Sequence, residues 1–209
     1  MMKFTKAIAL SLAALVAAGA IAGCGDQKKE AKALAEKKEI TVGITSGYSE
    51  QVMDFVAKKA EKEGLKVNLK TFGDYVTPDS ALASGDIDLN SYQHGPYLEA
   101  YNEKNGTKLI SIGNTYLAPL RIYSNKVTDL KDVPDGAKVS IPNDPSNGGR
   151  ALLLLDKKGL LKLKEGIDPT KAVVGDIVDN PKHLEILELE APQIPRSLDD
   201  VAISVINAG

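Results

Sequence analysis

The chain has 209 residues, with 26 lysines and arginines against 28 aspartates and glutamates, and a single cysteine. This length is sufficient for one large domain or for two lobes with real hydrophobic cores. The balanced charge argues against a polyanionic partner such as nucleic acid, and a single thiol excludes an internal disulfide.

The N-terminal segment has the pattern of an export signal. Two lysines precede an uncharged run rich in Ala and Leu at 7–22, which is shorter than the roughly 20 residues that a membrane-spanning helix needs. Small residues directly before Cys24 resemble the lipobox of a bacterial lipoprotein, which predicts cleavage before Cys24 and lipid modification of it. A secreted protein with an incidental cysteine is the alternative. We interpret residues 1–23 as a signal peptide and the charged residues 24–38 as a flexible tether.

After the tether, strands and helices are predicted to alternate. The first half should hold strands at 40–44, 65–72 and 87–92, helices at 49–63, 77–83 and 96–104, and a last strand that begins at 109–112 and leads through Tyr116 to Tyr123. The helix at 49–63 carries Val52, Phe55, Val56 and Ala60 on its apolar face. Strands followed by crossovers of this length indicate parallel pairing in an α/β fold.

A second set of elements is predicted beyond Tyr123. It comprises a helical turn at 127–132, a strand at 139–141, a helix over the leucines at 152–155, helical pieces at 168–170 and 176–179, a strand at 184–189, a short helix at 194–199 and a final strand at 201–206. The Pro-Lys-His sequence before the strand at 184–189 is typical of a surface turn. The chain is therefore predicted to fold as two α/β halves joined by an extended crossover.

The sequence Pro-Asn-Asp-Pro-Ser-Asn-Gly-Gly-Arg leads from a strand into the leucine-rich helix. Ser146 or Asn147 can cap this helix, while Gly148 and Gly149 are expected to leave the N–H groups of its first turn open to an anion. Arg150 follows in the same turn, so its guanidinium and the helix dipole act in the same direction on a carboxylate or phosphate. An arginine that only stabilises a turn is the alternative.

Histidines raise the question of metal binding or catalysis. A metal site at His94 would need further ligands, but the only other histidine, His183, lies in the predicted surface turn. The sequence has neither a G-x-S-x-G elbow nor a P-loop. We therefore expect a protein that is not an enzyme and that uses neither a metal nor a cofactor.

Six motifs carry a resemblance to a known family. They are Asp74-Tyr75-Val76, Gly85-Asp86-Ile87-Asp88, Tyr92-Gln93-His94-Gly95-Pro96-Tyr97-Leu98, the segment from Ile141 to Arg150, the segment from Pro195 to Asp200, and Val205-Ile206-Asn207. Together they resemble the methionine-binding lipoproteins, the NlpA family that serves ABC importers, over residues 40–207. The combination is far more specific than any single motif.

The resemblance implies a type II periplasmic-binding-protein fold of class α/β, with lobe one at 39–118 and lobe two at 119–209 around a ligand cleft. It implies a lipid-anchored solute-binding protein on the extracytoplasmic side of the cell membrane, which captures methionine in the L or D form. Its expected partners are the permease and the ATPase subunit of the importer. Family members continue for several tens of residues past the position of Asn207, so lobe one is expected to be incomplete.

The resemblance also implies a set of ligand-binding residues. Arg150 matches the family's carboxylate-binding arginine, and Asn207 matches an asparagine that contacts the polar end of the ligand. Tyr75, Tyr92 and His94 match the aromatic wall around the thioether, a lining that suits sulfur. Tyr116, from the crossover, is a further candidate. Ordinary core packing is the alternative for each tyrosine.

This sequence departs from the family pattern at three positions. Ser91 stands where an aromatic residue is usual, Gly95 where lysine is frequent and Tyr116 where histidine is frequent, so we expect a wider or more polar pocket. Another small amino acid or a methionine-containing dipeptide is therefore an alternative ligand. The alternative of another class is a surface lipoprotein with an adhesion or partner-binding role and no transport activity.

Overall fold

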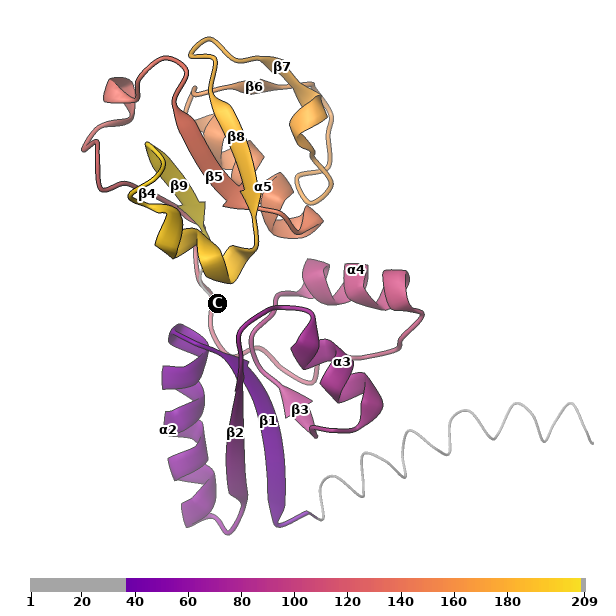
Figure 1. Ribbon diagram of the computed structural model, residues 1–209. Helices are drawn as coiled ribbons and strands as arrows, with labels where there is room; N and C mark the ends of the chain where they lie inside the picture. The colour runs from indigo at the N-terminus through magenta and orange to yellow at the C-terminus, as the bar shows by residue number, and fades with distance from the viewer. Residues whose placement is uncertain (1–36, 208–209) are drawn as a thin grey trace, which may run out of the picture.

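The computed structural model describes residues 37–207. Its elements form two α/β lobes, each built on its own sheet (Figure 1). We define lobe one as β1 to α4 and lobe two as β4 to β9. The predicted signal peptide, Cys24 and the predicted tether up to residue 36 lie outside the described residues.

Lobe one is a three-stranded parallel sheet with its helices. The elements are β1 (Glu39–Thr45), α2 (Tyr48–Lys62), β2 (Lys66–Phe72), α3 (Thr77–Ser84), β3 (Leu89–Asn90) and α4 (Gly95–Asn105). β1 lies in the centre, and its Val42 pairs with Leu69 of β2 and Leu89 of β3. The small core of this lobe combines Ile40, Val42 and Ile44 with Met53 of α2.

The buried face of α2 differs from the predicted one. Ser49 and Met53 are buried, whereas Phe55 is 65% exposed and Val56 is 39% exposed. The Ser49 hydroxyl donates a hydrogen bond to the backbone carbonyl of Ser91, and this bond fixes the rotation of the helix. The sequence pattern could not reveal a partner so distant in the chain.

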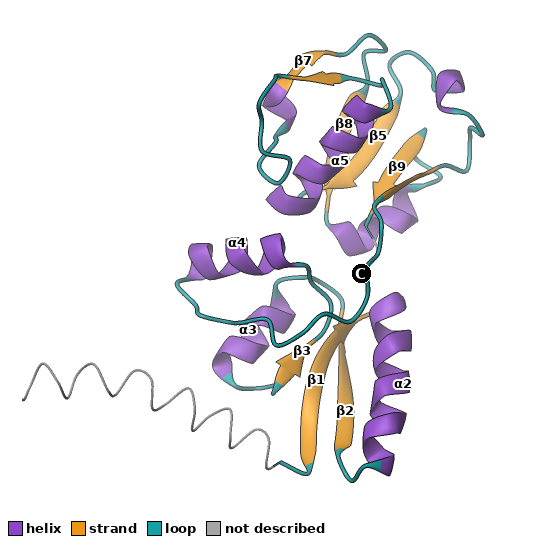
Figure 2. Ribbon diagram, turned by 180° about the vertical axis from the view of Figure 1, so that it is seen from behind, coloured by secondary structure: helices purple, strands orange, loops and turns teal. Residues whose placement is uncertain are grey.

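The strand predicted at 109–112 is absent from the described residues, and β3 is shorter than predicted. Figure 2 shows a long loop from α4 to β4 (Arg121–Tyr123) that crosses lobe one and enters lobe two. The side chain of Asn102 accepts from Leu109 N–H at 3.0 Å and donates to the Leu109 carbonyl at 2.8 Å. These bonds use the backbone groups that a strand partner would need, so the loop stays irregular.

Lobe two has a four-stranded sheet with the order β4-β9-β5-β8. The elements after β4 are η1 (Leu130–Asp132), β5 (Lys138–Pro142), α5 (Pro145–Lys157), β6 (Lys162–Leu163), η2 (Val174–Asp176), β7 (Ile177–Asp179), β8 (Glu185–Leu189), η3 (Ala191–Ser197) and β9 (Ile203–Ile206). β4 is antiparallel to β9, and the other pairs are parallel. A large apolar core fills the space between β5, β9 and α5, with Val139, Ile141, Leu155, Ile203 and Val205 fully buried.

Two of the predicted helical pieces are wrong. Residues 168–170 form a turn, and residues 177–179 form β7, which pairs antiparallel with β6. Asp176 accounts for the second difference, because its carboxylate accepts from Val173 N–H at 2.9 Å while its carbonyl accepts from Lys164 N–H at 3.0 Å. The chain thus closes one 3₁₀ turn and continues as a strand.

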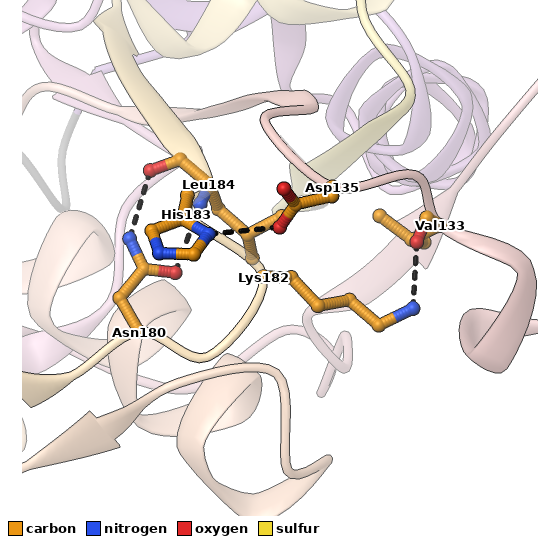
Figure 3. A network of polar contacts seen from close by, with 6 residues as sticks. All are labelled: Val133, Asp135, Asn180, Lys182, His183 and Leu184. Carbon is orange, nitrogen blue, oxygen red and sulfur yellow. Dashed lines mark hydrogen bonds and ion pairs between the residues drawn. The ribbon is translucent and has the colours of Figure 1, made fainter.

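The predicted Pro-Lys-His surface turn is confirmed. Polar contacts connect it to the segment before β5 (Figure 3). Lys182 Nζ donates to the carbonyls of Lys131 and Val133 at 2.7 and 2.6 Å. His183 Nδ1 lies 2.9 Å from Oδ1 of Asp135, and the hydrogen bond to this carboxylate raises the pKa of His183. This histidine is therefore part of a structural contact on the surface of lobe two.

Candidate functional site

α4 of lobe one faces the N-terminus of α5 in lobe two (Figure 1). Polar side chains from both lobes come into contact in this region. His94 Nε2 from lobe one lies 2.9 Å from Asn147 Oδ1 of lobe two. Asn207, which follows β9, donates from Nδ2 to the Tyr75 hydroxyl at 3.1 Å. These two contacts define the region between the lobes where a ligand could touch both.

The N-terminus of α5 is capped by Asp144. Its Oδ1 accepts from Asn147 N–H at 2.9 Å, so the prediction of a Ser146 or Asn147 cap is wrong. Ser146 Oγ also donates to Asp144, and Asn147 Nδ2 lies 3.1 Å from both carboxylate oxygens. Because the amide nitrogen of Asn147 faces Asp144, its Oδ1 is left to accept from other donors.

Arg150 is the sixth residue of α5, so it lies in the second turn and not in the first turn as predicted, and it is half-buried. Its Nη1 donates to Asn147 Oδ1 at 3.0 Å. Among the described residues, no carboxylate lies within ion-pair distance of its guanidinium. A guanidinium has five N–H donors, so several remain for an anionic group at the positive end of the helix.

Gly148 and Gly149 do not act as predicted. A Cβ at Gly148 would lie 2.7 Å from the Pro142 carbonyl oxygen, and one at Gly149 would lie 2.4 Å from that of Pro169. Gly148 N–H already donates to the Asp144 carbonyl at 2.8 Å. Both glycines therefore allow α5 to pack closely against neighbouring backbone, and they do not leave N–H groups open to an anion.

Three tyrosines form a cluster on the lobe-one side. Tyr75, Tyr92 and Tyr97 have ring centroids 5.7 to 6.2 Å apart. The hydroxyls of Tyr92 and Tyr97 both donate to the Tyr75 carbonyl, at 2.7 and 2.9 Å. Burial, reinforced by the Asp79 carboxylate, raises the pKa of Tyr92, and burial raises that of Tyr97, so both hydroxyls stay neutral donors.

His94 connects this cluster to α5. As the N-cap of α4 it accepts from Tyr97 N–H through Nδ1 at 3.2 Å, and its ring packs edge-on against Tyr97. In a neutral imidazole the other nitrogen then carries the proton. Nε2–H therefore donates to Asn147 Oδ1, which also accepts from Arg150.

The structure brings five of the six predicted ligand residues into this region: Tyr75, Tyr92, His94, Arg150 and Asn207. Tyr116 lies next to it and packs against Tyr48 at a ring-centroid distance of 6.3 Å. Asn147 and Tyr97 were missing from the predicted set. Tyr97 could have been found from its position three residues after His94, the N-cap of α4. Asn147 gave no such signal, because its sequence position is that of an ordinary capping residue.

Two open hollows of the described surface lie away from this region. They have volumes of about 460 and 530 Å³, are lined by α2 with β2 and by the surroundings of β4, and include none of the predicted ligand residues. Residues 37–207 contain no group of three or more His, Cys, Asp or Glu side chains arranged for a metal ion. In the same range, no helix has both the length and the apolar character needed to span a bilayer.

Comparison with known proteins gives consistent matches. The model of the family "NlpA lipoprotein" matches residues 40–209. The D-methionine-binding lipoprotein MetQ of Salmonella typhi is 48% identical over 202 residues, which cover 94% of this chain and 71% of the relative. MetQ of Escherichia coli K12 is 47% identical over 200 residues, with the same coverage.

Solved structures agree with these matches. The crystal structure of the methionine-binding protein MetQ superposes with a TM-score of 0.78 at 50% identity, covering 81% of this chain and 70% of that chain. A nutrient-binding protein from Burkholderia cenocepacia, solved bound to methionine, gives a TM-score of 0.77 at 50% identity over 80% and 71% of the two chains. The two α/β lobes thus have the fold of the periplasmic binding proteins, and the chain belongs to the NlpA lipoprotein family.

Proposed function

We propose that the protein is the solute-binding component of an ABC importer and that it captures methionine between its lobes. One observation carries the proposal: Arg150, without a carboxylate partner among the described residues, is linked through Asn147 and His94 to the tyrosine cluster. The role is binding and delivery, without chemical conversion of the ligand. MetQ relatives and a neighbour solved with methionine support this choice of ligand.

Each part of a zwitterionic amino acid has a chemical counterpart in this region. The guanidinium of Arg150, at the positive end of α5, suits the carboxylate. Asn207 Oδ1 is buried and has no hydrogen-bond partner among the described residues, so it can accept from the ammonium group. The tyrosine cluster offers ring edges to the thioether, with which sulfur makes favourable contacts.

In this proposal, lobe one at 39–118 and lobe two at 119–209 close over the ligand. Closure would bury most of a small ligand's surface, as in most small-molecule sites. Tyr116, on the segment between the lobes, packs against Tyr48 and would extend the aromatic wall on closure. The permease of the importer, whose partner is the ATPase subunit, receives the ligand when the lobes reopen.

Calorimetric titration of the purified protein with L- and D-methionine tests the function. We expect one molecule of at least one isomer to bind per chain. Mass spectrometry of the ligand released on denaturation identifies what the protein acquired during expression. If neither isomer binds and the released ligand is a different amino acid or a dipeptide, methionine is the wrong ligand.

We also propose that Cys24 carries a lipid anchor that holds the protein at the extracytoplasmic face of the cell membrane. The lipobox-like sequence before Cys24 supports this, as does membership of a lipoprotein family. Stable anchoring needs more than one acyl chain, which lipoprotein modification supplies. Cys24→Ser should move the protein to the soluble fraction or leave it unprocessed. Unchanged membrane association and processing would contradict the anchor.

A further inference from the structure

Asp79 is a fully buried carboxylate that binds the residues on either side of Tyr92. It lies in the first turn of α3 with 0% of its surface exposed. Its Oδ1 accepts two side-chain hydrogen bonds, from Asn90 Nδ2 at 2.7 Å and from Gln93 Nε2 at 2.6 Å. Among the described residues, no cation lies within ion-pair distance, and Oδ2 has no hydrogen-bond partner.

The two donors lie on either side of Tyr92. They belong to the segment 90–94, which leads from β3 into α4 and has no regular structure after Asn90. A segment without a helix or strand ladder must be fixed by other hydrogen bonds. Asp79 Oδ1 accepts two of these from side chains of the segment, and the Ser49 hydroxyl donates a third to the Ser91 carbonyl. Ser91 N–H also donates to the Gly43 carbonyl of β1 at 2.8 Å.

Two members of this segment face the proposed ligand region. The Tyr92 hydroxyl donates a hydrogen bond to the Tyr75 carbonyl, and His94 forms a hydrogen bond with Asn147 of lobe two. The orientations of the Tyr92 and His94 side chains both depend on the position of the 90–94 backbone. Removing Asp79 would leave two part-buried amide donors without their acceptor, and this loss favours a shift of the segment toward other acceptors.

We propose that Asp79 is a positioning residue for ligand capture, which holds the segment 90–94 so that Tyr92 and His94 face the N-terminus of α5. It does not touch the ligand. The affinity test of this inference rests on the proposed function, because it assumes that the protein binds methionine. The placement of the tyrosines can be measured without ligand.

The test compares Asp79→Ala with Asp79→Asn in the purified full chain. Asparagine keeps Oδ1 as the acceptor for both amides, and its Nδ2 replaces the unpaired Oδ2. We expect Asp79→Ala to weaken methionine binding at least about tenfold and Asp79→Asn to stay within about threefold of the original protein. The matched control is Asp176→Ala, which removes another buried carboxylate, with its bonds to Val173 and Lys164, from the β6–β7 end of lobe two. This control should leave methionine affinity unchanged.

Near-UV circular dichroism provides a readout that does not need ligand. The chain has no tryptophan and seven tyrosines, so a change in the Tyr75–Tyr92–Tyr97 cluster should alter this signal. We expect the spectrum of Asp79→Ala to change and those of Asp79→Asn and Asp176→Ala to match the original. If the original protein does not bind methionine, the proposed function fails, and this spectrum still decides the role of Asp79.

Three results would overturn the proposal. The first is a folded Asp79→Ala variant with unchanged methionine affinity and an unchanged tyrosine spectrum. The second is an Asp79→Asn variant as impaired as the alanine variant, because the charge and not the acceptor would then matter. If Asp79→Ala does not fold, Gln93→Ala removes one donor instead. The third result would be a Gln93→Ala variant whose methionine affinity and tyrosine spectrum match those of the original protein.

Discussion

At the residue scale, the amide oxygen of Asn147 joins the two lobes. It accepts from Arg150 Nη1 at 3.0 Å and from His94 Nε2 at 2.9 Å, while the amide nitrogen is held by Asp144. Two donors on one oxygen fix the guanidinium and the imidazole relative to each other. The orientation of Arg150 is therefore set before a ligand arrives, which lowers the entropy that binding must offset.

Arg150 should be the main electrostatic determinant of ligand affinity. Removing one side of a buried charge-assisted pair costs ~2–5 kcal/mol, so Arg150→Ala should weaken methionine binding at least about thirtyfold. Arg150→Lys should also weaken binding, because an ammonium group cannot reproduce the planar fork of guanidinium donors. Isothermal titration calorimetry measures both effects.

The control for this experiment is Lys157→Ala, which removes a cation from the other end of the same helix. Its methionine affinity should remain that of the original protein. Unchanged circular dichroism would establish that each variant is folded. An Arg150→Ala variant that binds within a few-fold of the original would contradict the assignment of the carboxylate to this residue.

At the element scale, local sequence signals located the first strand and the first three helices well. β1 was predicted at 40–44 and spans Glu39–Thr45, while α2, α3 and α4 also lie within one residue of their predicted bounds. The predicted sites Tyr75, Arg150 and Asn207 depended on motifs, which carry chemistry that periodicity does not. Local sequence patterns are sufficient to predict an element's bounds where its backbone hydrogen bonds stay within the element or its sheet.

Two of the failures share a physical cause. The strand predicted at 109–112 was lost to the side chain of Asn102, and the helix predicted at 176–179 was interrupted by the carboxylate of Asp176. A side chain that binds backbone groups competes with secondary structure, and propensity scales do not include it. Asn147 was missed as a site residue for a related reason, since its partner His94 lies in the other lobe.

Close packing of α5 leads to a prediction about Gly149. A methyl group there would lie 2.4 Å from the Pro169 carbonyl oxygen and 3.1 Å from Ala172 N, both backbone atoms that cannot rotate away. Gly149→Ala should therefore lower the free energy of unfolding by about 1–3 kcal/mol, the usual effect of overpacking. Urea denaturation would show this as a lower midpoint.

Gly175→Ala is the matched control, because a Cβ at Gly175 would meet nothing within 4 Å. Its unfolding free energy should stay within about 0.5 kcal/mol of the original. Equal midpoints for Gly149→Ala and Gly175→Ala would show that α5 can shift away from the 169–172 segment without loss. The close approach would then not be a requirement of the fold.

At the scale of the whole molecule, the two lobes have unequal cores. The core of lobe one is small and rests on Ile40, Val42, Ile44 and Met53, whereas the larger core of lobe two joins β5, α5 and β9. Lobe one also exposes Phe55 at 65%, and the loop from α4 to β4 exposes Ile110 at 74% and Leu117 at 97%. Since buried apolar area is the main source of stability, lobe two should be the more stable half.

Native-state hydrogen exchange can measure this difference. Regions with few buried apolar contacts open at lower free energy, so amides of β1 should exchange faster than those of β5, by at least about tenfold or ~1.4 kcal/mol. Val42 and Val139 are suitable reporters, because each lies in the central part of its sheet and is almost fully buried. Slower exchange in β1 would show that lobe one is the more stable half, whereas equal protection in the two strands would show that the lobes unfold as one cooperative unit. The His94–Asn147 and Asn207–Tyr75 contacts would then transmit the stability of lobe two to lobe one, and His94→Ala should separate the two exchange rates.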